Sequence, residues 1–421
     1  MLVALVLSAA AAAQPVTFTE HVAPILMENC VTCHRAGEVA PMSLLTFDEV
    51  RPWAKSMREA VTTRKMPPWD ADRGVGHFSN DISLSDAEVE TIAAWVDAGA
   101  PQGPEGAMPA IPEFPAGWKL GEPDRVVDIG AFDVPAEGEA LFITRAVRLN
   151  LPEERWIRAV DIQAEHREVL HHLVGIKGYL EMTAGGQNVA TGVQITANER
   201  LTVDIFSIWA AGSPPTIYPD GTGYTLDKDH CLSINVHYHP YGTPVTDNSK
   251  VGLYFGEGPL EREMITRFGL NTGIEIAANT VSPEFHASYV FGEDSRIISF
   301  FPHMHQRGKK MRYELTPPGG ETRALLNVPD YDFNWQWIYY PENGVAVPNG
   351  ARLDVFADYD NTAGNPNNPK PDMPIEFGEG TNEEMLIGFF SFISENNPAP
   401  SAPDSDLAVR TLLAAHPANE S

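Results

Sequence analysis

Short runs of alternating apolar and polar residues, separated by turn signals, fill the chain from about residue 125 to residue 395. Leu232 to Val236 and Arg352 to Phe356 are two such runs, and a period of two is typical of strands with one buried face. Turn dipeptides such as Asn349-Gly350 punctuate the runs, and the 34 glycines and 35 prolines of the sequence favour many more turns. Because long amphipathic helical patterns are almost absent, we expect an all-β region with room for two sandwiches.

The chain before residue 110 has a helical pattern instead. Two capping boxes, Thr46 to Glu49 and Ser85 to Glu88, each open an apolar stripe with helical spacing. The residues expected to face inward are Val50, Trp53, Ala54, Met57 and Val61 in the first stripe, and Val89, Ile92, Trp95 and Val96 in the second. Gly99 is expected to end the second helix.

Cys30-Val-Thr-Cys33-His34 is a CxxCH motif within this helical part. The two thiols have the spacing that bonds the vinyl groups of a haem, and the imidazole that follows can take one axial position on the iron. The motif therefore predicts one covalently attached haem c.

Short helices around this motif resemble a small class I type cytochrome c domain. A second axial ligand should come from a loop between the helices, and Met66 is the first choice because Pro67 and Pro68 stiffen its segment. Met42 is the alternative closer to the motif, and His77 ranks behind both.

Residues 1–13 form a short apolar run that ends in three alanines, which is typical of a secretory signal peptide and too short to span a bilayer. We therefore expect a periplasmic or secreted protein with no transmembrane segment. The net charge of −28 disfavours nucleic acid as a partner. Since the motif uses two of the three cysteines, Cys231 is expected to be a buried small hydrophobe.

Nine of the thirteen histidines lie in the β region before the tail, and several are grouped: His171-His172, His237-Tyr-His239 and His303-Met-His305. Residues i and i+2 of a strand share a face, so His303 and His305 can point at one ion. Adjacent His171 and His172 would face opposite sides of a regular strand. Joint ligation by these two therefore requires a bulge or a strand end.

Four motifs then occur in an order that resembles the copper type II, ascorbate-dependent monooxygenases, the family of the peptidylglycine α-hydroxylating and dopamine β-monooxygenases. They are Leu170-His-His-Leu173, Val236-His-Tyr238, His303-Met-His-Gln-Arg-Gly308 and Gly380-Thr-Asn-Glu-Glu-Met385. The resemblance covers roughly residues 125–395.

The resemblance implies two copper ions on two jelly-roll-like β-sandwich domains that face a solvent-filled cleft. It makes His171, His172 and His237 the site that stores and passes an electron. His303, His305 and Met385 become the catalytic site where O2 reacts with a C–H bond of a small-molecule substrate. Imidazole suits copper, and a thioether favours Cu(I).

One departure from that family concerns the substrate. Peptide-amidating members hold a substrate carboxylate with Arg, Asn and Tyr side chains, whose positions here are Phe301, Ile387 and Phe389. An apolar surface cannot pair a buried carboxylate, so we expect a substrate that is not anchored through one.

The expected organisation has six parts: signal peptide 1–13, cytochrome c domain 14–110, linker 111–124, three-histidine copper domain 125–260, second copper domain 261–396 and tail 397–421. Because a fused haem raises the local concentration of reductant, we expect it to replace or supplement ascorbate as the electron donor to the copper domains. The expected partner is an electron donor, either ascorbate or a periplasmic redox protein.

Two alternatives stay open at this point. The first is a non-enzymatic copper-binding or electron-transfer protein, in which the β region only holds metal. The second is a non-haem iron site formed by His303, His305 and Glu384 as a facial triad.

Overall fold

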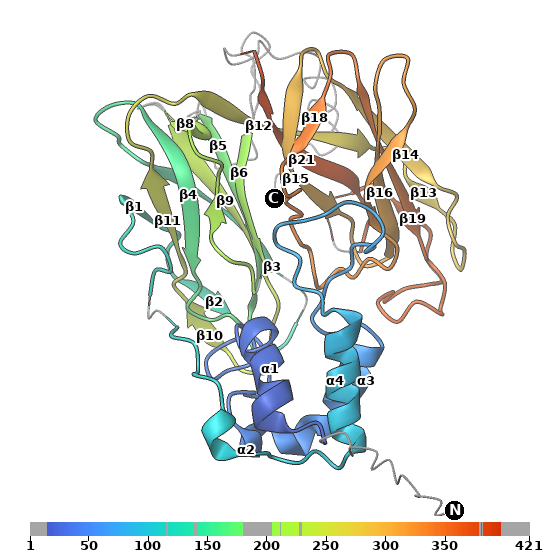
Figure 1. Cartoon of the computed structure of the whole chain (residues 1–421). Coiled ribbons are helices and arrows are strands. Elements are labelled where there is room, and N and C mark those ends of the chain that lie inside the picture. Colours follow the sequence, from blue (N-terminus) through green and yellow to red (C-terminus); the bar gives the residue numbers. More distant parts are fainter. Residues whose placement is uncertain are drawn as a thin grey trace, which may run out of the picture. The chain divides into compact units, whose positions relative to one another are not determined.

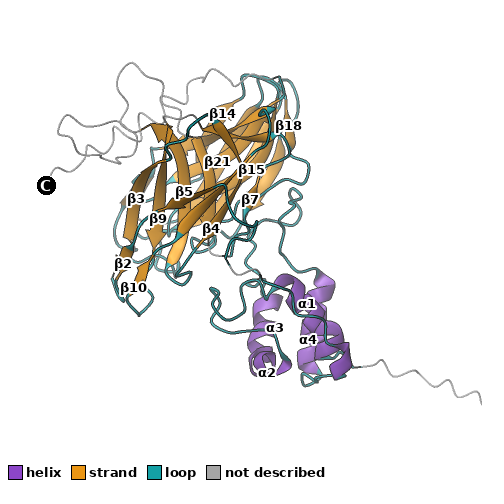
Figure 2. Cartoon of the chain, turned by 90° about the vertical axis from the view of Figure 1, so that its left-hand side faces the viewer, coloured by secondary structure: helices purple, strands orange, loops and turns teal. Residues whose placement is uncertain are grey.

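The computed structural model describes residues 15–396 apart from 115–116, 139–140, 180–203, 211, 227–229, 379 and 381. Strands dominate it, and helices of more than one turn occur only in the first hundred residues (Figures 1 and 2). The chain divides into two compact units. One comprises residues 1–69 and 82–114, and the other comprises residues 70–81 and 115–421. The signal peptide expected at residues 1–13 and the tail expected at 397–421 lie outside the described residues.

Unit 1 is a small helical bundle. Its helices are a π-turn at Phe18–Val22, α1 (Ala23–Asn29), α2 (Phe47–Val50), a 3-10 turn at Arg51–Trp53, α3 (Ala54–Thr62), α4 (Asp86–Asp97) and a 3-10 turn at Glu105–Ala107. Both predicted capping boxes are confirmed, since Thr46 and Ser85 each exchange hydrogen bonds with the glutamate three residues later. Gly99 follows α4 with a φ of +88°, as expected of a residue that ends a helix.

The first predicted stripe is wrong at Trp53. Pro52 lies within the 3-10 turn Arg51–Trp53 between α2 and α3, so the apolar residues do not follow one continuous α-helical period. Trp53 is 43% exposed, whereas Val50, Ala54, Met57 and Val61 are buried. In the second stripe Ile92 and Trp95 are fully buried.

Residues 70–81 connect α3 to α4 but belong to the β unit. The backbone N–H of Asp72 donates to the carbonyl of Asn327 at 2.7 Å, and that of Ser79 donates to Tyr340 at 2.8 Å. The Phe78 ring packs against Tyr339 with 5.4 Å between ring centroids. Part of the segment expected within the cytochrome domain is therefore an edge of the β unit.

Unit 2 contains every strand found in the described part of the chain. The strands up to residue 255 are β1 (Arg125–Asp128), β2 (Phe132–Val134), β3 (Leu141–Arg148), β4 (Arg155–Gln163), β5 (Leu170–Tyr179), β6 (Asp204–Ala210), β7 (Thr216–Ile217), β8 (Thr222–Leu226), β9 (His230–Tyr238), β10 (Val245–Asp247) and β11 (Lys250–Phe255). The later strands are β12 (Arg262–Asn271), β13 (Glu275–Ile276), β14 (Phe285–Val290), β15 (Ser295–His303), β16 (Gly308–Thr316), β17 (Arg323–Val328), β18 (Val345–Val347), β19 (Arg352–Tyr359), β20 (Ile375–Glu376) and β21 (Leu386–Ser394). The predicted all-β region is thus confirmed.

One sheet runs through the whole unit in the order β1-β11-β4-β8-β12-β21-β15-β18, with β7 paired to β4. Two four-stranded sheets, β3-β9-β5-β6 and β14-β19-β16-β17, accompany it. The link between its halves is a short parallel pairing of β8 with β12, next to the domain boundary expected near residue 260. The long sheet therefore joins the two halves of the β region, and the jelly-roll connectivity and the boundary itself stay predictions.

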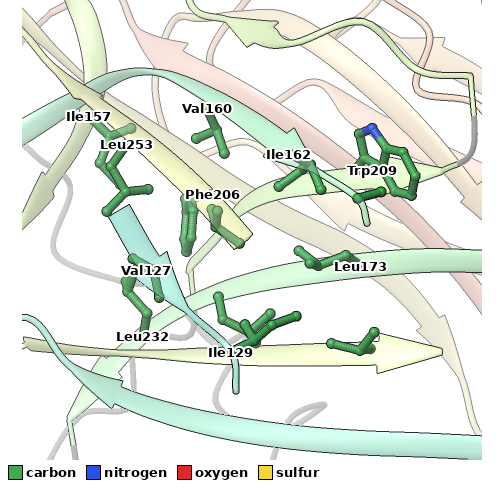
Figure 3. Packing of buried hydrophobic residues seen from close by; sticks show 14 of the residues in the cluster. Val127, Ile129, Ile157, Val160, Ile162, Leu173, Phe206, Trp209, Leu232 and Leu253 are labelled. Carbon is green, nitrogen blue, oxygen red and sulfur yellow. The ribbon is translucent and has the colours of Figure 1, made fainter. Parts of the chain in front are cut away.

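The first half buries a core between its two sheets. Figure 3 shows Val160 and Ile162 of β4 and Leu253 of β11 together with Leu173 of β5, Phe206 of β6 and Leu232 of β9. Alternate residues of each strand supply these side chains, because successive side chains of a strand point to opposite faces. Cys231 is 4% exposed, as predicted.

In the second half the sheets approach each other closely beside two paired glycines. Gly269 of β12 lies opposite Gly388 of β21. A Cβ on Gly388 would lie 2.6 Å from both methyl carbons of Val355 on β19, well inside contact distance. Glycine at this position thus lets β21, the strand that follows Met385, pack directly on the second sheet.

None of the described helices is both long and apolar enough to cross a membrane.

We predict that Gly388→Ala destabilises the β unit by about 1–3 kcal/mol, because the added methyl overpacks the contact with Val355. Gly292→Ala is the matched control, since a Cβ there meets nothing within 4 Å. The measurement is the urea midpoint of unfolding of the full chain, and equal midpoints for the two variants would contradict this account of the sheet contact.

Candidate functional site

His171, His172 and His237 converge in the four-stranded sheet of the first half. His171 and His172 begin β5, and His237 lies opposite His172 near the end of β9. The pairing register shifts between Leu170 and His172, so His171 is the extra residue of a β-bulge. The predicted bulge is confirmed, and it allows two adjacent histidines to serve one side of the sheet.

The distances between the three rings fit a single metal ion. The Nδ1 atom of His172 lies 3.1 Å from Nδ1 of His171 and 3.4 Å from Nδ1 of His237. Nitrogens bound at about 2.0 Å to one tetrahedral ion lie about 3.3 Å apart. Among the described residues, these three form the group of His, Cys, Asp or Glu side chains that is close enough to share an ion.

Burial keeps these imidazoles uncharged. It lowers the pKa of His171 to about 4 and the pKa of His237 to about 2, and neighbouring imidazoles add to both shifts. Burial, followed by the charges of His237 and His171, also holds the pKa of His172 well below its usual value. Since neutral imidazole is the form that binds metal, the cluster is ready for an ion at neutral pH.

His303, His305 and Met385 meet at one end of the β15–β21 pair. His303 is the last residue of β15 and lies opposite Ile387, two residues after Met385. The His303 and His305 rings are nearly perpendicular, with centroids 5.3 Å apart. The backbone N–H of His305 donates to the carboxylate of Glu384, the neighbour of Met385, at 2.9 Å. The backbone at Met385 therefore lies beside the two histidines, and joint ligation of one ion by the three side chains stays a prediction.

Hydrogen bonds fix which nitrogen of each ring is free. Nδ1 of His305 lies 3.0 Å from the carbonyl of Glu383, which can only accept, so Nδ1 carries the proton. Nδ1 of His303 lies 2.7 Å from Oε1 of Gln336, whose amide nitrogen donates to the carbonyl of Phe333. Both rings thus leave Nε2 for a metal, which is a common arrangement around bound ions. Burial lowers the pKa of His305 to about 3.

Glu384 has a structural role that disfavours the facial triad. Its side chain is fully buried, and its two oxygens accept the backbone N–H groups of His305 and Arg307 at 2.9 and 2.6 Å. Burial raises the pKa of Glu384 to about 8, against the effect of these hydrogen bonds. The Glu384 side chain orients the loop that carries His305. Because both of its oxygens already accept backbone N–H groups, it is poorly placed to bind a metal ion.

A cavity of about 40 Å³ lies near this second group, although His303, His305 and Met385 are not among the residues that line it. Phe301 and Phe389 line it, and their ring centroids lie 6.1 and 6.4 Å from that of His303. No charged side chain occurs among the described residues that line it. Its polar groups are hydroxyls such as those of Thr266 and Ser391, which lie 2.9 Å apart. The cavity therefore suits a small neutral molecule, with room for about three waters.

The haem-motif residues lie in unit 1, directly after α1. The backbone N–H of His34 donates to the carbonyl of Cys30 at 2.9 Å, and Cys30 and Cys33 are partly accessible and form no disulfide. Burial lowers the pKa of His34, and a hydrogen bond with the Met42 backbone opposes this shift. The choice between Met66, after α3, and Met42 as second axial ligand stays a prediction.

Several neighbours of the metal-ligand groups were not predicted from the sequence. Gln336 bonds to His303, Phe333 packs against both groups, and the ring of Phe142 stacks on His237 with 4.1 Å between centroids. The sequence signal that could have pointed to Gln336 and Phe333 is the aromatic-rich run from Tyr331 to Trp337, which contains both. His239, grouped with His237 in the sequence, is exposed and lies outside the cluster.

No protein-family model and no curated protein matches this sequence. Among solved structures, PNGF-II in a P21 space group aligns at 7% identity over 60% of each chain, with a TM-score of 0.25. Allantoicase aligns at 11% identity over 56% of this chain and 83% of its own, with a TM-score of 0.17. PBCV-1 VP54, fitted into a reconstruction of the virophage Sputnik, aligns at 9% identity over 70% of this chain and 99% of its own, with a TM-score of 0.26. Such low scores support no conclusion about fold or function.

We predict that His172→Ala removes metal binding at the three-histidine cluster, because the Nδ1 atom of His172 lies between the other two. The measurement is the number of Cu(II) or Zn(II) ions bound per chain by equilibrium dialysis. His286→Ala is the control, since His286 is hydrogen-bonded to Asp354 at 2.8 Å and lies outside the cluster. Equal metal content in the two variants would remove the cluster as a metal site.

Proposed function

We propose that this protein is a copper-dependent monooxygenase that hydroxylates a C–H bond of a small, neutral substrate with O2. The observation that carries the proposal is the presence of two groups of buried, neutral imidazoles in one β unit. One group is purely nitrogen-donating, and the other has a thioether beside it.

The donor sets fit copper at both places. His171, His172 and His237 would hold one ion through three imidazoles, and His303, His305 and Met385 would hold the other. A soft thioether combined with imidazole favours Cu(I), the state that reacts with dioxygen. When bound, copper at the second group supplies the activation of O2, and copper at the first supplies an electron.

The protein's own residues prepare the second group for this chemistry. Gln336 and the Glu383 carbonyl hold the protons on Nδ1 of His303 and His305, so that Nε2 faces the ion. Glu384 orients the backbone between them. Phe301 and Phe389 border the site and exclude water from one side.

The substrate class follows from the cavity beside His303. Its described lining has no cation that could pair a carboxylate, and burying an unpaired carboxylate is costly. Aromatic side chains bind an apolar body, while the Thr266 and Ser391 hydroxyls can bond one oxygen of a ligand. We therefore propose a neutral, largely apolar substrate that is not anchored through a carboxylate.

The helical unit supplies the electron donor in this proposal. A covalent haem bound by Cys30, Cys33 and His34, with Met66 as second axial ligand, would make the unit a cytochrome c that acts outside the cytoplasm. Tethering raises its effective concentration at the β unit. Ascorbate or a periplasmic redox protein would be the external source of electrons.

A non-enzymatic copper-binding or electron-transfer protein is the second candidate. The observation that favours this candidate is the three-histidine cluster, because such a cluster can hold a metal ion in a protein that has no substrate. The lined cavity beside His303 favours the enzyme, because a storage site has no use for one.

We predict that Met385→Leu lowers product formation at least about 100-fold, because changes around a bound metal already cost 10–100-fold. Copper-loaded full-length protein is supplied with ascorbate and small neutral aromatic and aliphatic candidates, and product mass spectrometry under 18O2 measures incorporated oxygen. His286→Ala should retain activity. Absence of substrate-dependent oxygen uptake in the unaltered protein would favour the non-enzymatic candidate.

We also predict that the haem is oxidised by the copper-loaded β unit on the timescale of turnover. Stopped-flow absorption of the reduced protein measures haem oxidation after O2 and substrate are added. A Cys30→Ala, Cys33→Ala variant, which cannot attach haem covalently, should depend fully on ascorbate. Equal turnover of the two proteins without ascorbate would rule out the haem as donor.

A further inference from the structure

The loop of residues 330–337, between β17 and β18, touches both groups of metal ligands. The Phe333 ring stacks on His171, with 5.4 Å between centroids and 22° between planes. It also lies 6.1 Å from His237 and 6.2 Å from His305, nearly perpendicular to the latter. Phe333 is only 9% exposed. A single buried side chain thus contacts imidazoles of both groups, where the family resemblance led us to expect an open cleft.

Hydrogen bonds hold the rest of the loop against the second group. The Gln336 amide bridges Nδ1 of His303, at 2.7 Å, and the carbonyl of Phe333, at 3.1 Å. The Tyr331 hydroxyl donates to the carbonyl of Met304 at 2.7 Å. Phe333 is therefore linked to His303 through Gln336, while its ring packs against the first group.

We propose that Phe333 couples the two groups, so that metal binding at one raises the affinity of the other for metal. The proposal rests on the proposed function in one respect, that both groups bind copper. Phe333 acts here as a positioning residue and takes no part in ligation.

The physical basis is the close packing of the loop between the two groups. An ion at the first group fixes the His171 and His237 rings, and these rings fix one side of Phe333. Tightly packed side chains cannot shift singly, so the restraint passes to Gln336 and the His303 imidazole. Linkage is reciprocal, because a gain in affinity in one direction requires the same factor in the other.

The test is an anaerobic titration of the full chain with Cu(I) in competition with a chromophoric chelator. X-ray absorption identifies the second group by the sulfur of Met385. We expect this group to bind Cu(I) at least about fivefold more weakly in His172→Ala than in the unaltered chain. In a Phe333→Ala background, the His172→Ala change should alter that affinity less than about twofold, since the contact is already lost.

Three further variants control the experiment. In a Phe333→Tyr background, His172→Ala should again weaken Cu(I) binding at the second group about fivefold, because the aromatic ring remains. Phe333→Leu replaces Phe333→Ala if the alanine variant does not fold. Phe356→Ala should not change the effect of His172→Ala on Cu(I) affinity at the second group. Phe356 stacks on His286, outside both groups, with 4.8 Å between centroids.

Three results would overturn the inference. If both groups bind copper but His172→Ala leaves the affinity of the second group unchanged, Phe333 does not couple them and the proposed function still stands. The same conclusion follows if His172→Ala weakens Cu(I) binding at the second group equally in the Phe333→Ala background and in the unaltered chain. If either group binds no copper, the coupling and the proposed function fail together.

Discussion

Burial of uncharged imidazoles is the constraint on which both metal-ligand groups depend. An isolated histidine in water is partly protonated near neutrality, whereas desolvation lowers the pKa of His171, His237 and His305 to about 4, 2 and 3. Removing the imidazoles from water costs free energy, and other interactions of the fold must offset that cost. Strand pairing holds the histidines in place: His172 is opposite His237 on β5 and β9, and His303 is opposite Ile387 on β15 and β21.

The two halves of the β unit are more closely integrated than two independent sandwiches would be. The long sheet crosses from β8 to β12, and the 330–337 loop of the second half supplies a buried ring to the cluster of the first. Packing of this kind keeps water away from ligands on both sides.

The sequence predicted much of the local structure around these groups and little of what connects them. Capping boxes and the bulge at His171 follow from local rules, because a turn of helix or one extra strand residue is decided within a few positions. The inward placement of Trp53 failed because Pro52 interrupts the helical period. Contacts of Phe333 and Gln336 depend on pairings between distant strands, which no local pattern specifies.

The segment of residues 70–81 makes the helical unit discontinuous in the sequence, because this stretch between α3 and α4 belongs to the β unit. Its backbone is hydrogen-bonded to residues 327 and 340, and Phe78 is buried on that surface. The chain therefore enters the β unit after residue 69 and returns to the helical unit before α4 begins. Removing the first 114 residues would therefore also remove a segment that is hydrogen-bonded to the β unit, and a truncation meant to isolate that unit has to keep residues 70–81.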